Sequence, residues 1–460
     1  MTGAGGGTYR RSEEFMVERR WSVRIGMACG GFVALLSTES VARADDPPPS
    51  QSDDARVRAL EEQVKQLQKD LDAVSRRMPA AQPTTPEPIA SLAEGSTKPA
   101  TNAAVTIGGY VEAFWQWNFN QPSNHITNYR GFDNRHDSFT IENAVIDAQG
   151  TLGPVSAHVA LQVGNTPDTY YAGEPVWKAT RGAGPSGPTY WQNIQQANLA
   201  YVAPIGRGLT LDAGIFLSPI GPEGIAIKDQ WNWSRSNLFF GLPAYHTGAR
   251  ATYPLTERMT VSVQLYDGWN SVVDNNLQLS PAAQFTYNVT NKVTYNALYF
   301  GGVERAPGAP EGQAWRHLFD TYLAFYPRSW LSTLFHFDAG FEPNNFGTSA
   351  WAAGAVYLRV RPRPWLYLAA RGDVFYEWTA ENASGAASPI FWAGARWVSS
   401  GTATVDLRPG DNMSVRIEYR HDEAQRALFF QGQVATDALG NYIPNARSQD
   451  TITLGAVAWF

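Results

Sequence analysis

The chain has 460 residues and a net charge of −6, and 17% of its residues are charged whereas 13% are aromatic. This composition, with 41 Gly and 29 Pro, favours an all-β class over a helical or a nucleic-acid-binding one. Because no run of about 18 or more apolar residues follows residue 50, a helical membrane protein is excluded.

The first segment has the layout of a secretory signal. Arginines at 19, 20 and 24 precede an apolar stretch over 25–36, and Ala42-Arg43-Ala44 has the small residues that a signal peptidase reads. The single Cys29 lies inside the apolar stretch, so the mature protein would contain no disulfide and no thiol-based site. We expect a signal peptide with an N-terminal extension over residues 1–44, and export through the Sec route.

Residues 45–78 contain apolar side chains spaced alternately three and four residues apart, which indicates a short coiled coil in the periplasm. A coiled coil of about three heptads is marginal alone and requires partner chains. The alternative is a single amphipathic helix that lies on the rest of the protein. We expect a homo-oligomer held through these positions: Val57, Leu60, Val64, Leu67 and Leu71, continued by Val74 and Met78.

Residues 79–103 form a Pro-rich stretch without periodicity, typical of an extended linker. From residue 104 to residue 460, apolar and polar residues alternate in long segments, as in strands that cross a bilayer with one face toward lipid. We count about sixteen such strands: 105–119, 138–149, 155–164, 191–203, 209–217, 245–253, 259–269, 279–289, 293–300, 315–326, 331–341, 350–360, 365–378, 391–407, 412–420 and 451–460.

The connections between these segments alternate between short turns and long loops. Residues 150–154, 204–208 and 254–258 are short and rich in Pro, Gly and Arg, whereas 120–137, 165–190 and 218–244 are long. A β-sandwich does not predict this alternation, but a transmembrane antiparallel β-barrel with its turns toward the periplasm does. An even strand number places both ends of the barrel in the periplasm, where the coiled coil also belongs.

Several short motifs, taken in their order and spacing, resemble the OmpL-like β-barrel porin-2 family of Gram-negative bacteria. The resemblance covers residues 107–460 and implies an outer-membrane porin, but says little about the solute. The heptads depart from the barrel pattern and resemble the periplasmic coiled coils of some trimeric porins, so we favour a trimer. The motifs are Gly109-Tyr110-Val111-Glu112-Ala113, Phe132-Asp133-Asn134-Arg135-His136, Ser218-Pro219-Ile220-Gly221, Asn232-Trp233-Ser234-Arg235-Ser236, Tyr245-His246-Thr247-Gly248 with Arg250, and Asp267-Gly268-Trp269-Asn270.

A barrel of about sixteen strands leaves an aqueous lumen, which would allow passive diffusion of small hydrophilic solutes or ions. Facing rows of opposite charge would create a transverse field that favours polar solutes; alternatively, the charges pair across strands to keep the wall rigid. Clear anion selectivity would need a basic excess, which is absent. The residues expected on the lumen side are Glu112, Asp212, Arg250, Asp338, Arg359, Arg371, Asp373, Glu377, Arg396, Asp406, Arg416, Glu418 and Arg420.

The long segment 218–244 is the candidate constriction of the channel. It combines Glu223, Lys228, Asp229 and Arg235 with the aromatic residues at 231, 233, 239 and 240, so it has both filter charges and mass to pack against an inner wall. The alternative is an outer loop on the lipopolysaccharide side.

Other functions have weaker support in the sequence. Trp and Tyr residues are expected in interfacial girdles rather than in a sugar slide, and Asp133, Asn134 and Asp137 in a turn rather than a calcium site. No cofactor or metal is expected. A barrel lipase or protease would use His317 or His336 as its base, and a non-conducting anchor would tether the membrane through the coiled coil.

The last ten residues alternate, with Ile452, Leu454, Ala456 and Ala458 in the same phase as the terminal Phe460. This apolar phase predicts a lipid-facing strand that closes the barrel against residues 105–119. Phe460 resembles the C-terminal signal read by the barrel assembly machinery, which we expect as a partner together with outer-membrane lipid and lipopolysaccharide.

Overall fold

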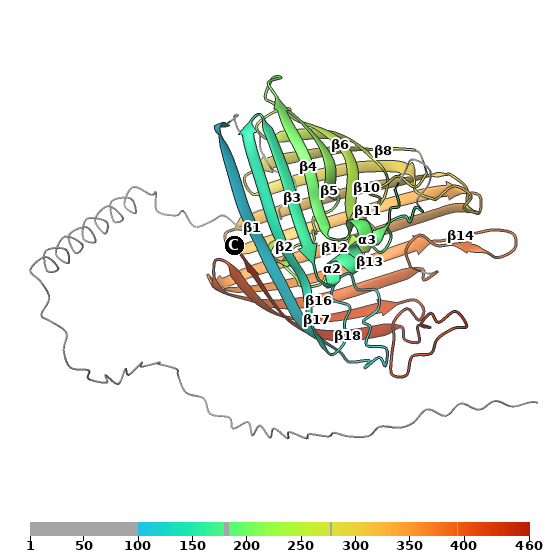
Figure 1. Cartoon of the computed structure of the whole chain (residues 1–460). Helices are drawn as coiled ribbons and strands as arrows, with labels where there is room; N and C mark the ends of the chain where they lie inside the picture. Colours follow the sequence, from blue (N-terminus) through green and yellow to red (C-terminus); the bar gives the residue numbers. More distant parts are fainter. Residues whose placement is uncertain (1–99, 179–183, 277, 393) are drawn as a thin grey trace, which may run out of the picture. The chain divides into compact units, whose positions relative to one another are not determined.

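The computed structural model describes residues 100–178, 184–276, 278–392 and 394–460, and it contains a closed antiparallel β-barrel (Figure 1). Each strand pairs with its neighbour in sequence, and β18 pairs with β1 to close the sheet. In the described residues, no helix is long and apolar enough to cross a membrane. The expected signal peptide and coiled coil, and most of the expected linker, lie outside the described residues.

The barrel has sixteen strands, as the alternation of the sequence predicted. They are β1 (Ala100–Asn118), β2 (Ser138–Gly153), β3 (Val155–Val163), β4 (Ile194–Ala203), β5 (Leu209–Leu217), β6 (Tyr245–Pro254), β7 (Met259–Tyr266), β8 (Ser280–Thr290), β9 (Val293–Val303), β10 (Trp315–Arg328), β11 (Leu331–Asn344), β12 (Gly347–Arg363), β13 (Leu366–Trp378), β16 (Trp397–Gly410), β17 (Met413–Ala424) and β18 (Ser448–Trp459).

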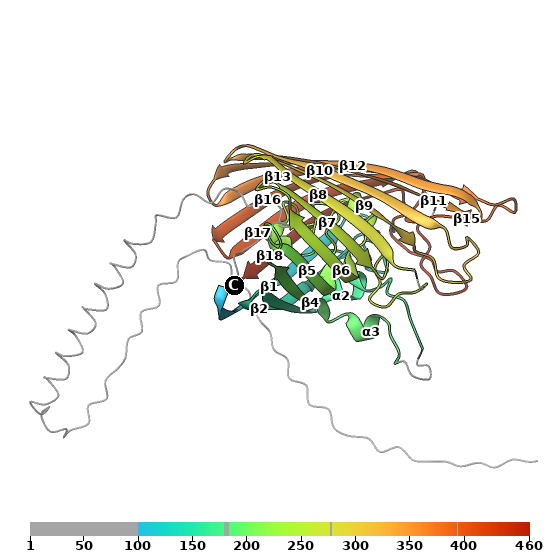
Figure 2. The same ribbon diagram turned by 90° about the horizontal axis from the view of Figure 1, so that it is seen from above.

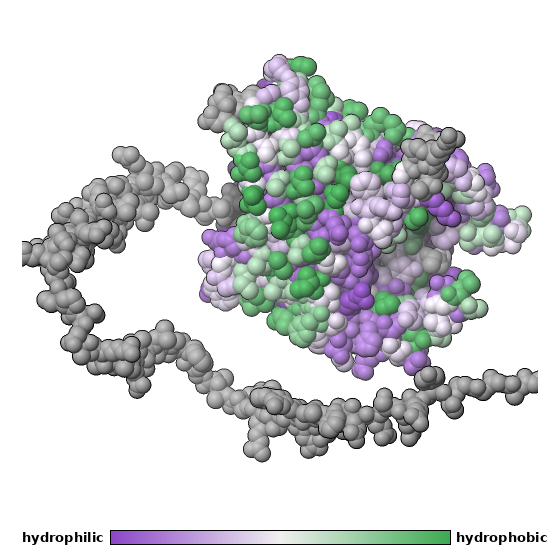
Figure 3. Space-filling model, in the orientation of Figure 1, coloured by the Kyte–Doolittle hydropathy of each residue, from purple (hydrophilic) through white to green (hydrophobic). Residues whose placement is uncertain are grey.

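Side chains alternate between the two faces of the wall. On β18, Ile452 and Leu454 are exposed on the outside, whereas Thr451 and Thr453 are buried on the inside. Figure 3 shows apolar side chains gathered over the outer face near β1 and β2. An apolar exterior and a polar interior are the arrangement of a membrane-spanning barrel, so the predicted phase of the strands is confirmed.

The two ends of the barrel differ (Figure 2). One end, the short-turn end, carries the tight turns and the chain terminus at Phe460. The other end, the long-loop end, carries the long connections, with helices α2 (Asn165–Tyr170), α3 (Pro188–Trp191) and α4 (Asn237–Phe240), the 3₁₀ turn η1 (Ile227–Asp229), and the hairpin of β14 (Ala380–Glu381) and β15 (Ala387–Ser388). The alternation of connection lengths is confirmed.

Three predicted strands were too long at the long-loop end. Residues 191–193 and 267–269 are not in strands, and the strand predicted over 391–407 begins only at Trp397. Residues before Trp397 leave the wall because Trp392 is buried and packs against Phe375 and Phe240, with ring centroids 5.3 and 6.2 Å away. Burial of this aromatic cluster outweighs continued strand pairing.

Candidate functional site

The segment 218–244, called the inserted loop below, lies inside the barrel. It leaves β5 and returns to β6, yet it binds β13, β16 and β17, which lie across the lumen in the strand order. The Asn237 side chain donates to Asp373 on β13 at 2.8 Å, and the Asn232 side chain donates to Thr404 on β16 at 2.7 Å. The loop therefore crosses the lumen.

Apolar residues bury the inserted loop against the wall. Trp233 is fully buried, and its ring lies 6.3 Å from the ring of Phe114 on β1. Ile227 and Trp233 belong to one buried cluster with Tyr110, Phe114 and Val457 of β1 and β18. Ser236 caps the N-terminus of helix α4, because its hydroxyl accepts the backbone N–H of Phe239 at 3.4 Å. Burial and capping give the loop a defined conformation.

Carboxylates of the wall accept backbone N–H groups of the inserted loop. Glu418 on β17 accepts the N–H of Trp233 at 2.5 Å and of Ser234 at 2.9 Å. Glu112 on β1 accepts the N–H of Ile227 at 2.5 Å, and Glu142 on β2 accepts the Trp233 indole N–H at 2.8 Å. These hydrogen bonds tie the loop to three strands of the wall, so the three acidic side chains act as anchors of the loop.

Arginines of the wall bind the carbonyl groups of the same loop. Arg371 on β13 donates to the carbonyls of Ser234 at 2.6 Å and Arg235 at 3.1 Å. Arg416 on β17 donates to the Asn232 carbonyl at 3.1 Å, and Arg420 also donates to the Arg235 carbonyl. The wall thus satisfies donors and acceptors of a buried irregular segment, which would otherwise carry a large desolvation cost.

Two charged residues of the inserted loop brace its own fold. Glu223 accepts the Ser236 N–H at 3.0 Å and pairs with Arg371 at 3.1 Å. Arg235 donates to the Trp233 carbonyl at 2.8 Å and lies 3.4 Å from the Glu142 carboxylate. Both side chains are nearly fully buried. They therefore hold the loop in place rather than facing the solvent of the lumen.

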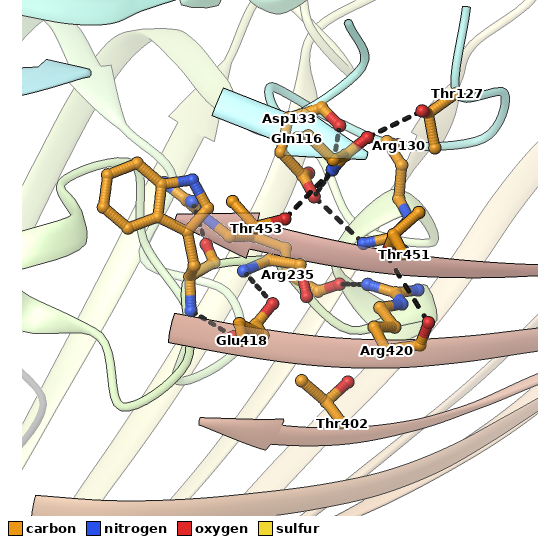
Figure 4. A network of polar contacts seen from close by, with 12 residues as sticks. Gln116, Thr127, Arg130, Asp133, Arg235, Thr402, Glu418, Arg420, Thr451 and Thr453 are labelled. Atoms are coloured by element: carbon orange, nitrogen blue, oxygen red, sulfur yellow. Dashed lines mark hydrogen bonds and ion pairs between the residues drawn. The ribbon is translucent and has the colours of Figure 1, made fainter. Parts of the chain in front are cut away.

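A second long loop joins this network (Figure 4). Arg130, in the loop after β1, pairs with Asp133 at 2.9 Å and with Asp422 on β17 at 3.1 Å. Asp422 also pairs with Arg420 at 2.7 Å. Burial raises the pKa of Asp133, with Arg130 opposing that effect. Asp133 therefore forms an ion pair with an arginine of its own loop.

The remaining predicted charges lie elsewhere. Asp212 and Arg250 pair at 2.6 Å across β5 and β6, and Lys228 pairs with its neighbour Asp229 at 2.9 Å. The side chains of both members of the second pair are about a third exposed, at 31% and 32%.

Arg396 was predicted to lie in a strand, but it is exposed and precedes β16, because the chain there turns toward the buried Trp392. It is not part of the network.

The alternation of polar and apolar residues did not identify Glu142 as a residue of the inner wall. The alternation assigned one residue in two to the lumen, but Glu142 and Asn143 are both fully buried. The pairing of β1 with β2 shifts between Glu112 and Ala113, opposite these residues. Such a β-bulge places two successive side chains on nearly the same side of the sheet, and it has no reliable sequence signal.

The histidines considered for an enzyme are engaged in the wall. His336 lies 2.6 Å from Asp320, and His317 lies 2.9 Å from the Tyr299 hydroxyl. A Ser218–His246 contact of 3.2 Å was not foreseen, but His246 is fully buried and stacks on Tyr266 at 4.1 Å. Within the described part of the chain, no group of three or more His, Cys, Asp or Glu could hold a metal ion.

Comparison with known proteins adds a family. The family model described as "Putative beta-barrel porin-2, OmpL-like" matches residues 104–460. Among solved structures, the chain is similar to the anion-selective porin from Comamonas acidovorans, at 10% identity over 78% of this chain and 100% of that chain, with a TM-score of 0.50. It is also similar to the outer membrane channel DcaP of Acinetobacter baumannii, at 12% identity over 79% of this chain and 99% of that chain, with a TM-score of 0.49. The likeness to these structures concerns the fold alone. No curated protein matches the chain.

Proposed function

The chain belongs to the OmpL-like β-barrel porin-2 family and is an outer-membrane porin, and we propose that its inserted loop forms the constriction of a passive diffusion channel. The observation that carries this proposal is the set of hydrogen bonds from the loop to β13, β16 and β17 across the lumen. A sixteen-stranded barrel is wide enough for an aqueous channel, and a fixed loop inside it reduces the opening. Small hydrophilic solutes or ions would pass beside the loop.

The charges that act on a permeating ion are the partly exposed ones. The Lys228–Asp229 pair is about a third exposed, and Arg250 of the Asp212–Arg250 pair is 20% exposed. The buried anchors, such as Glu418, make their hydrogen bonds to the loop. The predicted transverse field is therefore carried by few residues, because most lumen charges are committed to holding the loop.

The short-turn end belongs in the periplasm in this proposal. Both barrel termini lie at that end, so residues 45–78 can form their coiled coil there and join three copies. The barrel assembly machinery would recognise Phe460, and the outer face of the barrel would contact lipid and lipopolysaccharide. The exposed apolar side chains on the outside of the strands support the lipid contact.

Conductance in a planar bilayer tests the proposal. The purified protein is expected to form ion channels, and deletion of Gly224 to Ser236 is expected to raise the single-channel conductance, because it removes mass from the lumen. The matched control deletes Asn382 to Ala386 at the tip of the β14–β15 hairpin, which lies outside the barrel wall.

Two results would contradict the proposal. A protein that inserts but forms no channels would be a structural anchor. An unchanged conductance after the loop deletion, equal to that of the hairpin control, would place the constriction elsewhere. Hydrolysis of esters or peptides by the purified protein would support the enzyme alternative.

A further inference from the structure

One arginine on the inner wall differs from the others in its partners. Arg359 lies on β12 in the same phase as Trp351 and Tyr357, whose side chains are buried on the inside. Among the residues that the structure describes, it forms no ion pair with a carboxylate. Its guanidinium instead lies over the rings of Trp231, at 4.7 Å, and Tyr367, at 5.4 Å. Arg359 is half-buried.

Two further arginines surround the same tyrosine. The guanidinium carbons of Arg408 and Arg361 lie 4.6 and 5.9 Å from the centre of the Tyr367 ring. Stacking on an aromatic face stabilises a cation and leaves the N–H groups at its edge available. Three guanidinium groups therefore gather around one ring, at the opening of the barrel where β12 turns into β13.

The carboxylate of Asp406 neutralises only part of this group, because it forms an ion pair with Arg408 and not with Arg359 or Arg361. Asp406 accepts Arg408 at 3.0 Å, lies 3.5 Å from Arg416 and accepts the Ser414 hydroxyl at 2.6 Å. Its two oxygens are thus already engaged with residues on β16 and β17. Positive charge remains in excess around Tyr367.

The whole short-turn end is basic. Seven basic side chains but only two acidic ones lie in the short turns or within three residues of them, in a chain with a net charge of −6. Acidic and basic residues nearly balance over the whole chain, but basic side chains are in excess at the short-turn end. A basic opening with low-dielectric walls concentrates anions from solution.

We propose that Arg359, Arg361 and Arg408 form a subsite for a small oxyanion, a carboxylate or a phosphate, at the short-turn side of the inserted loop. The N–H groups of Arg359 supply the hydrogen bonds, and Trp231 fixes its orientation from the loop. Because Arg359 points into the lumen, the ligand is a permeating solute rather than a lipid head group. This inference rests on the proposed channel function and names the class of solute.

The test uses the full-length protein in planar bilayers with a gradient of KCl. Arg359→Gln removes the charge without leaving a carboxylate unpaired, and Arg396→Gln makes the same change at an exposed site in the long-loop end. The reversal potential of the Arg359 variant is expected to shift toward cation selectivity, whereas that of the control stays at the wild-type value. Arg361→Gln is a second variant, expected to shift in the same direction.

Binding is measured as block of the current by inorganic phosphate or acetate added at the short-turn side. The anion concentration that blocks half of the current should rise severalfold in Arg359→Gln. Arg359→Lys keeps the charge, so its ion selectivity should be close to that of the wild type. Its block by the anion should remain weaker than in the wild type, because lysine lacks the planar fork of donors. Bilayers with and without an anionic lipid should give the same block. Block that depends on the lipid would indicate a head-group site and overturn the proposal.

The failures of the two proposals can be told apart. Channels that conduct, but whose selectivity and block do not change in Arg359→Gln, overturn the subsite and leave the porin intact. A wild-type protein that inserts and carries no current overturns both. Insertion of each variant is checked by its outer-membrane level and by its heat-sensitive migration on a gel.

Discussion

The indole of Trp233 lies directly against the backbone of Gly455. A Cβ added to Gly455 would overlap atoms of the indole ring, so only glycine allows this approach. Gly455 is on β18, which closes the barrel, and Trp233 is on the inserted loop. The closing strand and the inserted loop are therefore in close contact, and this contact offers a way to displace the loop without deleting it.

Gly455→Ala should loosen the inserted loop. The added methyl group overpacks the contact with Trp233, at a cost of about 1–3 kcal/mol in similar cases. We expect a higher and noisier single-channel conductance, with a normal amount of protein in the membrane. The control is Gly401→Ala on β16, where an added Cβ meets no atom within 4 Å. Equal conductance of the two variants would show that the wall tolerates the methyl group without moving the loop.

Removal of Phe460 should impair insertion rather than conductance. Its backbone N–H donates to the Gly109 carbonyl at 3.1 Å, and its own carbonyl accepts the Gly109 N–H at 3.2 Å. These bonds join Phe460 to β1, and the residue is 73% exposed on the outside, where assembly factors could reach it. We expect lower outer-membrane levels and unchanged conductance per channel. A conservative Phe460→Tyr variant should insert normally, and normal levels of the deletion variant would refute an assembly signal.

The loop after β7 should become less ordered as the pH rises. Burial raises the pKa of Glu304 to about 7 from its ordinary 4.5, opposed by Arg316, and its carboxyl group accepts the Trp269 N–H at 2.7 Å. The ordered loop therefore favours the protonated form of Glu304. The stability of the ordered loop relative to the disordered one is greatest below about pH 4.5, and this contribution is lost as the pH rises to about 7. Burial also raises the pKa of Asp267 to about 6, which acts in the same direction.

Hydrogen exchange checks this dependence. Amides of residues 267–276, corrected for intrinsic exchange, should be better protected at about pH 5 than at about pH 8. Glu304→Gln cannot ionise and should reduce the difference. The remaining part is due to Asp267 and to Glu174, whose pKa is also raised by burial and whose carboxyl group accepts the Val272 N–H at 2.9 Å. Equal protection at both pH values in the wild-type protein would contradict the assignment.

Oligomerisation should depend on the heptads before the barrel. Leu60→Asp with Leu67→Asp places charges at two expected core positions, which should convert trimers to monomers without changing the barrel. The matched control substitutes Glu61→Lys and Lys65→Glu, which keeps the charges on the expected outer face. Chemical cross-linking or native mass measurement reads out the state. Trimers that persist in the Leu60/Leu67 variant would place the contact between barrels instead.

The sequence alone determined the barrel. We could predict the number of strands, the phase of each strand and the alternation of turns and loops. Successive side chains of a strand point to opposite faces, so a strand with lipid on one side shows a sequence period of two residues. Closure of the sheet could be predicted too, since an unpaired edge is unfavourable in a membrane. Predictions failed mainly at strand ends, where burial of residues such as Trp392 decided the course of the chain.

Only the tertiary structure decided what the charges do. Glu418 meets Ser234 although they are 184 residues apart in sequence, and no local pattern predicts that contact. The sequence placed Glu112, Arg371 and Glu418 on the inner face, but it did not distinguish anchors of a loop from charges that face solvent. The inward direction of Glu142 could not be predicted because it depends on a β-bulge. The absence of an ion pair at Arg359 could not be predicted because the overall charge balance does not show which charges meet. Alternation fixes a side chain's direction, whereas its partners depend on which distant segments the closed barrel brings together.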